Sequence, residues 1–121
     1  MPPTMTPSPS DPHVLLLSNR FKITTKWTKK NGETGPGTAI KFATPDTGAF
    51  WFFGPNNYEV MVKTLNGCGV NQKWWVFAGG LTNVKVEMTV IDTQTGASKV
   101  YVNPQSTAFQ PIQDTGAFPC P

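Results

Sequence analysis

The chain has 121 residues, enough for one domain with one hydrophobic core. Only 14% of the residues are charged, and the 11 glycines, 12 prolines and frequent Thr and Val favour strands and turns over helices. The net charge is +3, but Arg20 is the only arginine, and proteins that read nucleic acids usually rely on arginine, so the composition does not predict a nucleic-acid partner. No apolar run reaches the roughly 18 residues of a membrane span, so no membrane span is predicted.

The first twelve residues, MPPTMTPSPSDP, are mostly proline, threonine and serine with a single charge. Such a composition is typical of an extended linker, of the kind that joins modules in secreted proteins. We therefore predict a linker over residues 1–12 and one domain over residues 13–121.

Short strands separated by turn-forming residues are predicted from His13 onward. After a short apolar run over residues 14–17, residues 20–30 alternate strictly between apolar and polar side chains, as in a strand with one buried face. The predicted core face of this strand carries Phe21, Ile23, Thr25 and Trp27. A glycine-rich loop over residues 31–37 ends the strand. A weaker strand over residues 38–44 and an aromatic strand over residues 49–53 come next.

The second half of the chain continues this pattern. Residues 58–65 alternate, with Tyr58, Val60 and Val62 predicted on one face and Glu59, Met61 and Lys63 on the other. A turn over residues 66–69 leads into an aromatic strand over residues 73–78. Residues 82–91 and 98–103 form a predicted hairpin around a loop at residues 92–96, with Val84, Val86, Met88 and Val90 inside. The tail from Pro104 is predicted to be mostly irregular.

Seven to eight short strands, with no helical pattern of ten residues, indicate an all-β fold. Strands separated by turns in this way are typical of an antiparallel β-sandwich, Ig-like in its general architecture.

The two cysteines, Cys68 and Cys120, predict a disulfide. Cys120 lies between two prolines at the C-terminal end of the chain, where a cysteine contributes little to packing unless it is tied down. The bond would close a long loop, which chain-entropy arithmetic relates to about 4 kcal/mol of stabilisation. Such a bond forms in an oxidising compartment. Two free thiols in a cytosolic protein are the alternative.

No set of residues predicts catalysis, a metal or a cofactor. His13 is the only histidine and lies beside the linker, so no Ser or Cys nucleophile is matched with a positioned base. One histidine and two cysteines are too few for a zinc site. Oxygen ligands for calcium could come from Asp46, Asn56, Asn57 and Glu59, but Asx-turn chemistry explains these residues better. The sequence therefore predicts a protein that is not an enzyme.

Two aromatic runs, at residues 50–53 and 74–77, place large apolar groups on both faces of their strands. If Phe50, Phe52, Trp74 and Val76 point inward, then Trp51, Phe53, Trp75 and Phe77 point outward. Left bare on neighbouring strands, the outward rings would form an apolar patch of a size that monomers rarely expose.

Three interpretations of the outward rings compete. In the first, the apolar segment at residues 15–17, the C-terminal tail or a bulge covers them. In the second, they form a surface for a protein partner or for self-association. In the third, they stack on the faces of sugar rings, with Asn71, Gln72 and Lys73 as neighbouring hydrogen-bonding groups.

Several motifs occur in an order that resembles a known sequence type. They are RF at residues 20–21, TGAFWFF at 47–53, VKTLNGCGVN at 62–71, WVFAGGLTNV at 75–84 and DTGAF at 114–118. Over residues 15–118 the chain is similar to a recurrent all-β accessory domain of bacterial exported proteins. The resemblance implies export and a module with no settled activity, so it assigns no catalytic residue. Such domains often carry a cysteine near Leu15 or Leu16, where this chain has none.

We therefore expect a non-catalytic module, secreted or on the cell surface, that works by binding or assembly. Its predicted binding residues are Trp51, Phe53, Trp75, Phe77 and Tyr58, and its predicted partner is a protein or a second copy of the chain. A carbohydrate-binding module that takes a polysaccharide on the same rings is the alternative. A third possibility is a protease-inhibitor-like domain that presents the loop at residues 32–37.

Overall fold

The computed structural model describes residues 11–121. In this part of the chain, ten strands form two five-stranded antiparallel sheets, so the predicted all-β sandwich is confirmed. Residues 1–10 of the predicted linker lie outside the described residues.

The first sheet is built around β2, which is long enough to pair with two short strands on the same side. Its order is β1-β2-β8-β9, and β3 pairs with the second half of β2. The strands of this sheet are β1 (His13–Leu16), β2 (Phe21–Thr28), β3 (Thr34–Pro36), β8 (Lys85–Asp92) and β9 (Ser98–Asn103). The predicted hairpin over residues 82–103 is present as β8 and β9.

The second sheet carries both aromatic runs. Its order is β10-β7-β6-β5-β4, with antiparallel pairing throughout. Its strands are β4 (Thr38–Lys41), β5 (Thr47–Trp51), β6 (Tyr58–Gly67), β7 (Lys73–Gly80) and β10 (Ile112–Pro119). A single helical turn, α1 (Cys68–Asn71), connects β6 to β7.

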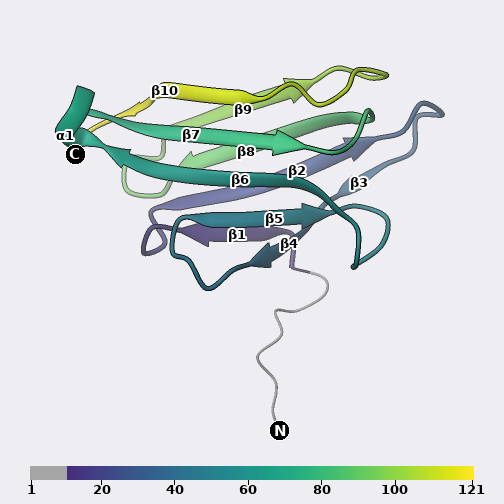
Figure 1. Cartoon of the computed structure of the whole chain (residues 1–121), viewed down its shortest axis with the longest axis horizontal. Coiled ribbons are helices and arrows are strands. Elements are labelled where there is room, and N and C mark those ends of the chain that lie inside the picture. The colour runs from purple at the N-terminus through teal and green to yellow at the C-terminus, as the bar shows by residue number, and fades with distance from the viewer. Residues whose placement is uncertain (1–10) are drawn as a thin grey trace, which may run out of the picture.

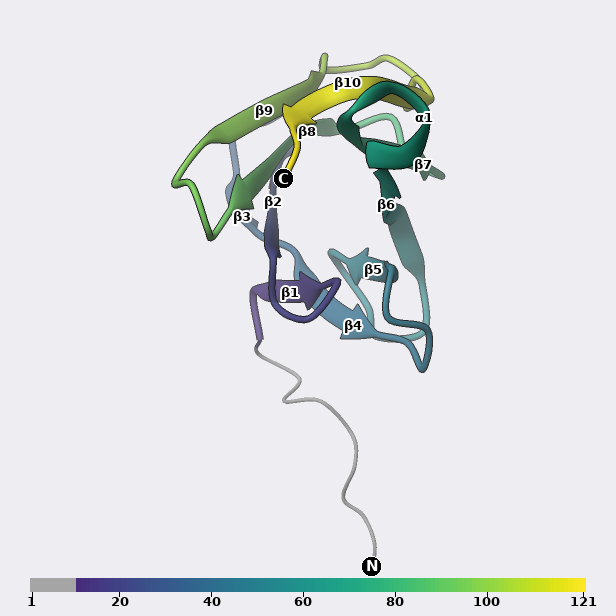
Figure 2. The same cartoon turned by 90° about the vertical axis from the view of Figure 1, so that its left-hand side faces the viewer.

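The two sheets approach each other along both of their edges. The strands run along the long axis of the domain (Figure 1), and the end-on view in Figure 2 shows them surrounding a common core. On one side β1 lies beside β4, where Lys41 Nζ donates to the carbonyl of Leu15 at 3.0 Å. On the other side β9 lies beside β10, where Lys99 and Tyr101 both bind Asp114. These side-chain contacts link the two sheets at both edges of the sandwich.

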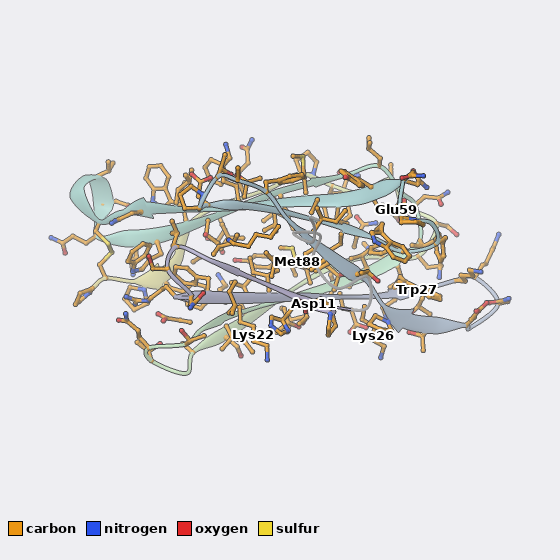
Figure 3. All side chains as sticks on the ribbon, turned by 90° about the horizontal axis from the view of Figure 1, so that it is seen from below. Asp11, Lys22, Lys26, Trp27, Glu59 and Met88 are labelled. Carbon is orange, nitrogen blue, oxygen red and sulfur yellow. A yellow bond between two sulfur atoms is a disulfide. The ribbon has the colours of Figure 1, made fainter. Side chains whose placement is uncertain are left out.

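Apolar side chains from both sheets fill the space between them. The predicted core face of β2 is buried, and so are Val86, Met88 and Val90 on β8. From the second sheet come Phe50, Val60, Val62 and Val76, which are almost fully buried. Figure 3 shows Met88 between the layers and Lys22 and Lys26 on the outside, as the period-two pattern of these strands requires.

The structure has ten strands, where the sequence predicted seven or eight. The loop predicted over residues 31–37 contains β3, which is only three residues long and is held to β2 by three residue pairs. The tail predicted to be irregular contains β10. Buried and exposed residues do not alternate along the whole of β10, because its register with β7 shifts between Asp114 and Phe118. Of the turn predicted over residues 66–69, the first two residues end β6 and the last two begin α1.

The predicted disulfide is present at one end of the sandwich. Cys68, at the start of α1, is bonded to Cys120, just beyond β10, and their Cα atoms are 5.8 Å apart. Figure 1 shows α1 and the C-terminal end of the chain together at this end. The bond therefore ties the last strand of the second sheet to the connection between β6 and β7.

A buried ion pair lies at the same end. Arg20 and Asp92 are both almost fully buried, with Nε donating to Oδ1 at 2.7 Å and Nη2 donating to Oδ2 at 2.8 Å. The guanidinium group lies over the ring of Trp74, 4.9 Å from its centroid, and Nη2 also donates to the carbonyl of Pro121 at 2.8 Å. One side chain thus links both sheets to the C-terminal segment.

Candidate functional site

The outer face of the second sheet carries the apolar surface that the sequence predicts. On β7 the inward side chains include Val76, which is fully buried, and Trp74, which packs against the core. The alternate residues Trp75, Phe77 and Gly79 therefore face outward. Neither of the two covering segments considered from the sequence lies across them, because β1 pairs with β2 in the other sheet and β10 extends the sheet beside β7.

Trp75 and Phe77 form a pair of nearly parallel rings along β7. Their centroids are 6.1 Å apart, the angle between the ring planes is 12°, and both side chains are half-buried. Trp75 Nε1 donates to Asn71 Oδ1 at 2.9 Å, which fixes the orientation of the indole. Gly67, on the neighbouring strand β6, makes room for this ring, since a Cβ there would overlap the indole. The position of Trp75 therefore depends on α1 and on a glycine of β6.

Beyond Phe77 the row of side chains on β7 is interrupted at Gly79. A Cβ built on Gly79 would have no atom within 4 Å, so the glycine forms the open floor of a groove. The groove has a volume of about 590 Å³. Its lining residues are Phe42, Thr44, Thr47, Met61, Val62, Lys63, Phe77, Ala78, Gly79, Pro111, Ile112 and Gln113. We call this feature the Gly79 groove.

Strand register divides the floor of the Gly79 groove into two rows. In the first row Thr47, Lys63, Phe77 and Gln113 lie opposite one another across four strands. In the second row Met61 and Gly79 lie opposite each other, and Met61 also pairs with Ala49, which is fully buried and does not line the groove. The rows are two residues apart along the strands, a spacing of about 7 Å. The first row therefore contains three polar side chains and Phe77, whereas the second row is entirely apolar.

The other predicted binding residues lie in two different places. Tyr58 is opposite Trp51 on β5, and its ring is 6.3 Å from that of Phe42, which lines the groove. Phe53 is not among the lining residues. It packs against Trp27, with ring centroids 4.9 Å apart, and lies under the ammonium group of Lys29. Of the predicted binding residues, the structure therefore brings only Phe77 into the groove. Trp75 and Tyr58 lie beside lining residues, Trp51 lies opposite Tyr58, and Phe53 lies elsewhere.

The predicted alternation of β6 fails at its first two residues. Tyr58 is exposed and Glu59 is buried, whereas the sequence predicts Tyr58 on the same face as Val60 and Val62, which are buried. The cause is a register shift next to Trp51, where Phe50 pairs with Val60 but Trp51 pairs with Tyr58, so Glu59 is the extra residue of a bulge. Burial raises the pKa of the Glu59 carboxyl, although a hydrogen bond from Thr82 acts in the opposite sense.

An ion-pair cluster holds β10, which supplies one wall of the groove. Lys99 Nζ and Tyr101 Oη both donate to Asp114 Oδ2, at 2.6 and 2.7 Å, and the backbone N–H of Gly116 donates to Oδ1. Partial burial alone would raise the pKa of Asp114, but these three hydrogen bonds outweigh it and hold the pKa below its usual range. The wall formed by Pro111, Ile112 and Gln113 is thereby anchored next to the cluster.

The chemistry of the Gly79 groove is apolar, with one cation. Among the residues that line it in the described part of the chain, Lys63 is the only ionisable one. Over residues 11–121, no three His, Cys, Asp or Glu side chains gather in a group that could hold a metal ion. The same residues include no helix of the length and apolarity needed to cross a membrane. The groove can therefore bury apolar ligand surface and offer one ammonium donor.

Several residues of the groove could not be identified from the sequence alone. The dipeptide Gly79-Gly80 looks like the end of a strand, and nothing in the sequence shows that Gly79 leaves open space rather than facing a neighbour. By contrast, Gly80 faces inward against Phe109. Met61 and Lys63 fall on the predicted outer face of β6, and this alternation is the signal that could have included them. Phe42 and Gln113 come from segments with no clear pattern.

Comparisons with protein-family models, with curated proteins and with solved structures found no match to this chain. The resemblance to an accessory domain of exported proteins therefore stays a prediction.

Proposed function

We propose that this domain is a non-catalytic binding module that takes an apolar ligand in the Gly79 groove. The observation that carries this proposal is the open space over Gly79 between outward-facing apolar side chains, of which Met61 is 51% exposed. A volume of about 590 Å³ is within the range of ligand pockets, which are mostly apolar with few polar groups. Methionine adapts its shape to different ligands, so Met61 suits a binding wall.

We also propose that the domain works outside the cell or on its surface. The disulfide between Cys68 and Cys120 supports this, because such bonds persist in oxidising compartments. The proposal is also consistent with the Pro-rich composition of residues 1–12, which is typical of linkers in secreted proteins.

The two alternative functions have weaker support. Of the three hydrogen-bonding residues that the sequence offers for a sugar platform, Asn71 uses both ends of its amide within the domain, accepting from Trp75 and donating to the carbonyl of Thr115. A protease-inhibitor-like loop presents free backbone groups to the protease, whereas Thr34–Pro36 is paired with β2 as β3. Both observations favour the groove as the functional feature.

Filling the groove tests the proposal. In Gly79→Leu the new side chain enters open space from a backbone without a positive φ, so the fold should tolerate it. The variant should bind the uncharged apolar dye Nile red about tenfold more weakly than the unaltered protein, a loss of about 1.4 kcal/mol. Dye fluorescence gives the affinity, and thermal unfolding shows whether the variant is folded.

A pair of matched surface variants provides the control. Met61→Gln removes an apolar wall of the groove, while Val102→Gln removes an equally exposed apolar side chain, 51% against 54%, from the outer face of β9. Only Met61→Gln should weaken dye binding. If Gly79→Leu and Met61→Gln bind the dye as tightly as the unaltered protein, the groove is not the binding site.

A further inference from the structure

Among residues 11–121, Lys63 is the one charged residue that lines the Gly79 groove, and it has no ionic partner there. The ion pairs within residues 11–121 involve other residues, and no acidic side chain lies within 4.0 Å of its ammonium group. Its cross-strand neighbours are Thr47 and Phe77, which carry no charge. Asp46, next to Thr47 in the chain, accepts a hydrogen bond from the Thr47 hydroxyl at 2.8 Å. Lys63 is therefore available to a ligand.

The arrangement of the two rows gives the groove a polar end and an apolar end. Lys63 and Gln113 flank Phe77 in the first row, and both side chains carry N–H donors. The second row, which holds Met61 and Gly79, offers no side-chain hydrogen-bonding group. A ligand that fits both rows needs an anionic or acceptor group at one end and a purely apolar body at a distance of about 7 Å.

We propose that the natural ligand of the Gly79 groove is a single-chain amphiphile with a carboxylate head, such as a free long-chain fatty acid. This inference rests on the proposed function and names the class of ligand. The carboxylate binds at Lys63 and Gln113, and the acyl chain lies over Met61 and Gly79, in the space that Phe42 and Pro111 line on opposite sides. Charge complementarity selects an anion, because no acidic residue lines the groove within the described part of the chain.

Two ligands with the same chain and opposite head charges test the proposal. Dodecanoate and dodecyltrimethylammonium are titrated into the protein below their micelle concentrations, and binding is followed by tryptophan fluorescence and calorimetry. Dodecanoate should bind more tightly than the cationic ligand. Lys63→Gln should weaken dodecanoate about fivefold, as expected for a partly exposed ion pair, and should leave the cationic ligand unweakened. Lys26→Gln, a lysine on the outer face of β2, is the matched control and should change neither affinity.

The outcomes separate this inference from the function on which it rests. Equal affinity of the unaltered protein and Lys63→Gln for dodecanoate, or tighter binding of the cationic ligand, would overturn the carboxylate assignment. In that case loss of Nile red binding in Gly79→Leu would still support the groove as a binding site. Undiminished binding of both amphiphiles by a folded Gly79→Leu would overturn the proposed function together with the inference.

Discussion

Replacing Arg20 with methionine should lower the free energy of unfolding by about 3–5 kcal/mol at neutral pH. Both members of the Arg20–Asp92 pair are almost fully buried and joined by two hydrogen bonds. Removing the guanidinium leaves the Asp92 carboxylate buried with no cation, and an uncompensated buried charge is costly. The same change removes the contact with the Trp74 ring and the hydrogen bond to the carbonyl of Pro121. Urea denaturation measures the loss.

The size of this loss should depend on pH. Burial alone would raise the pKa of Asp92, but hydrogen bonds from Arg20 and from the backbone N–H of Gln94 hold it below its usual range. A lowered carboxyl pKa stabilises the folded state above the unfolded pKa, near 3.9, and this contribution disappears as the pH falls through the folded pKa. In Arg20→Met burial is no longer opposed by the guanidinium, so the pKa of Asp92 rises. The difference in stability between the two proteins should therefore narrow as the pH falls from this raised pKa toward the lowered pKa of the unaltered protein.

A half-exposed ion pair provides the comparison for the buried one. Lys99→Met removes the partner of Asp114, whose side chain is still bound by Tyr101 and Gly116. This variant should lose about 1 kcal/mol or less. A loss in Arg20→Met no larger than that in Lys99→Met would contradict a structural role for the buried pair.

Removing the disulfide should be the second most costly change. The bond joins residues 52 positions apart, and closing a loop of that length in the unfolded chain corresponds to about 4 kcal/mol of stabilisation. The double variant Cys68→Ala, Cys120→Ala should therefore unfold at a much lower denaturant concentration than the oxidised protein. Amide hydrogen exchange should also be faster near Phe118, because the end of β10 pairs with β7 next to Cys120.

The reduced protein is the control for the alanine variant. Reduction breaks the same bond without changing a side chain, so the reduced protein and the double variant should have similar unfolding midpoints. An oxidised protein that unfolds at the same midpoint as the reduced one would show that the bond contributes nothing to stability.

The parts of the fold that the sequence predicts are those with strong period-two patterns. The inward residues of β2 and β8 and the outward direction of Trp75 and Phe77 all follow from strict alternation, and the structure confirms them. A cysteine between two prolines contributes little to packing, so the sequence predicts the disulfide, and the structure contains it.

The predictions from the sequence fail where pairing with a strand distant in the chain, and not the local alternation of apolar and polar residues, determines the structure. The bulge at Glu59 depends on the register between β5 and β6, which the sequence of β6 alone does not encode. Likewise β10 exists because its residues complete the edge next to β7 and bury Phe118 against Phe21, with ring centroids 5.5 Å apart. Such contacts bring together residues almost a hundred positions apart in the chain.

The candidate site was predicted only in part for a related reason. The sequence identified large outward rings, but a groove is defined by the absence of a side chain, and Gly79 gives no positive signal in a pattern of hydrophobic residues. Phe53, the one predicted residue that lies apart, is at the end of β5, where the strand has already stopped and alternation no longer sets direction.

The most direct test of the groove is to map a bound apolar ligand onto the structure by nuclear magnetic resonance. Hexanol, which is small and uncharged, is titrated into the ¹⁵N-labelled protein while the amide signals are followed. Shifts that saturate together at Met61, Phe77, Gly79 and Gln113 are the predicted result. Shifts confined to the outer face of β9 or to the loop at residues 32–37, with the signals of β6 and β7 unmoved, would contradict it.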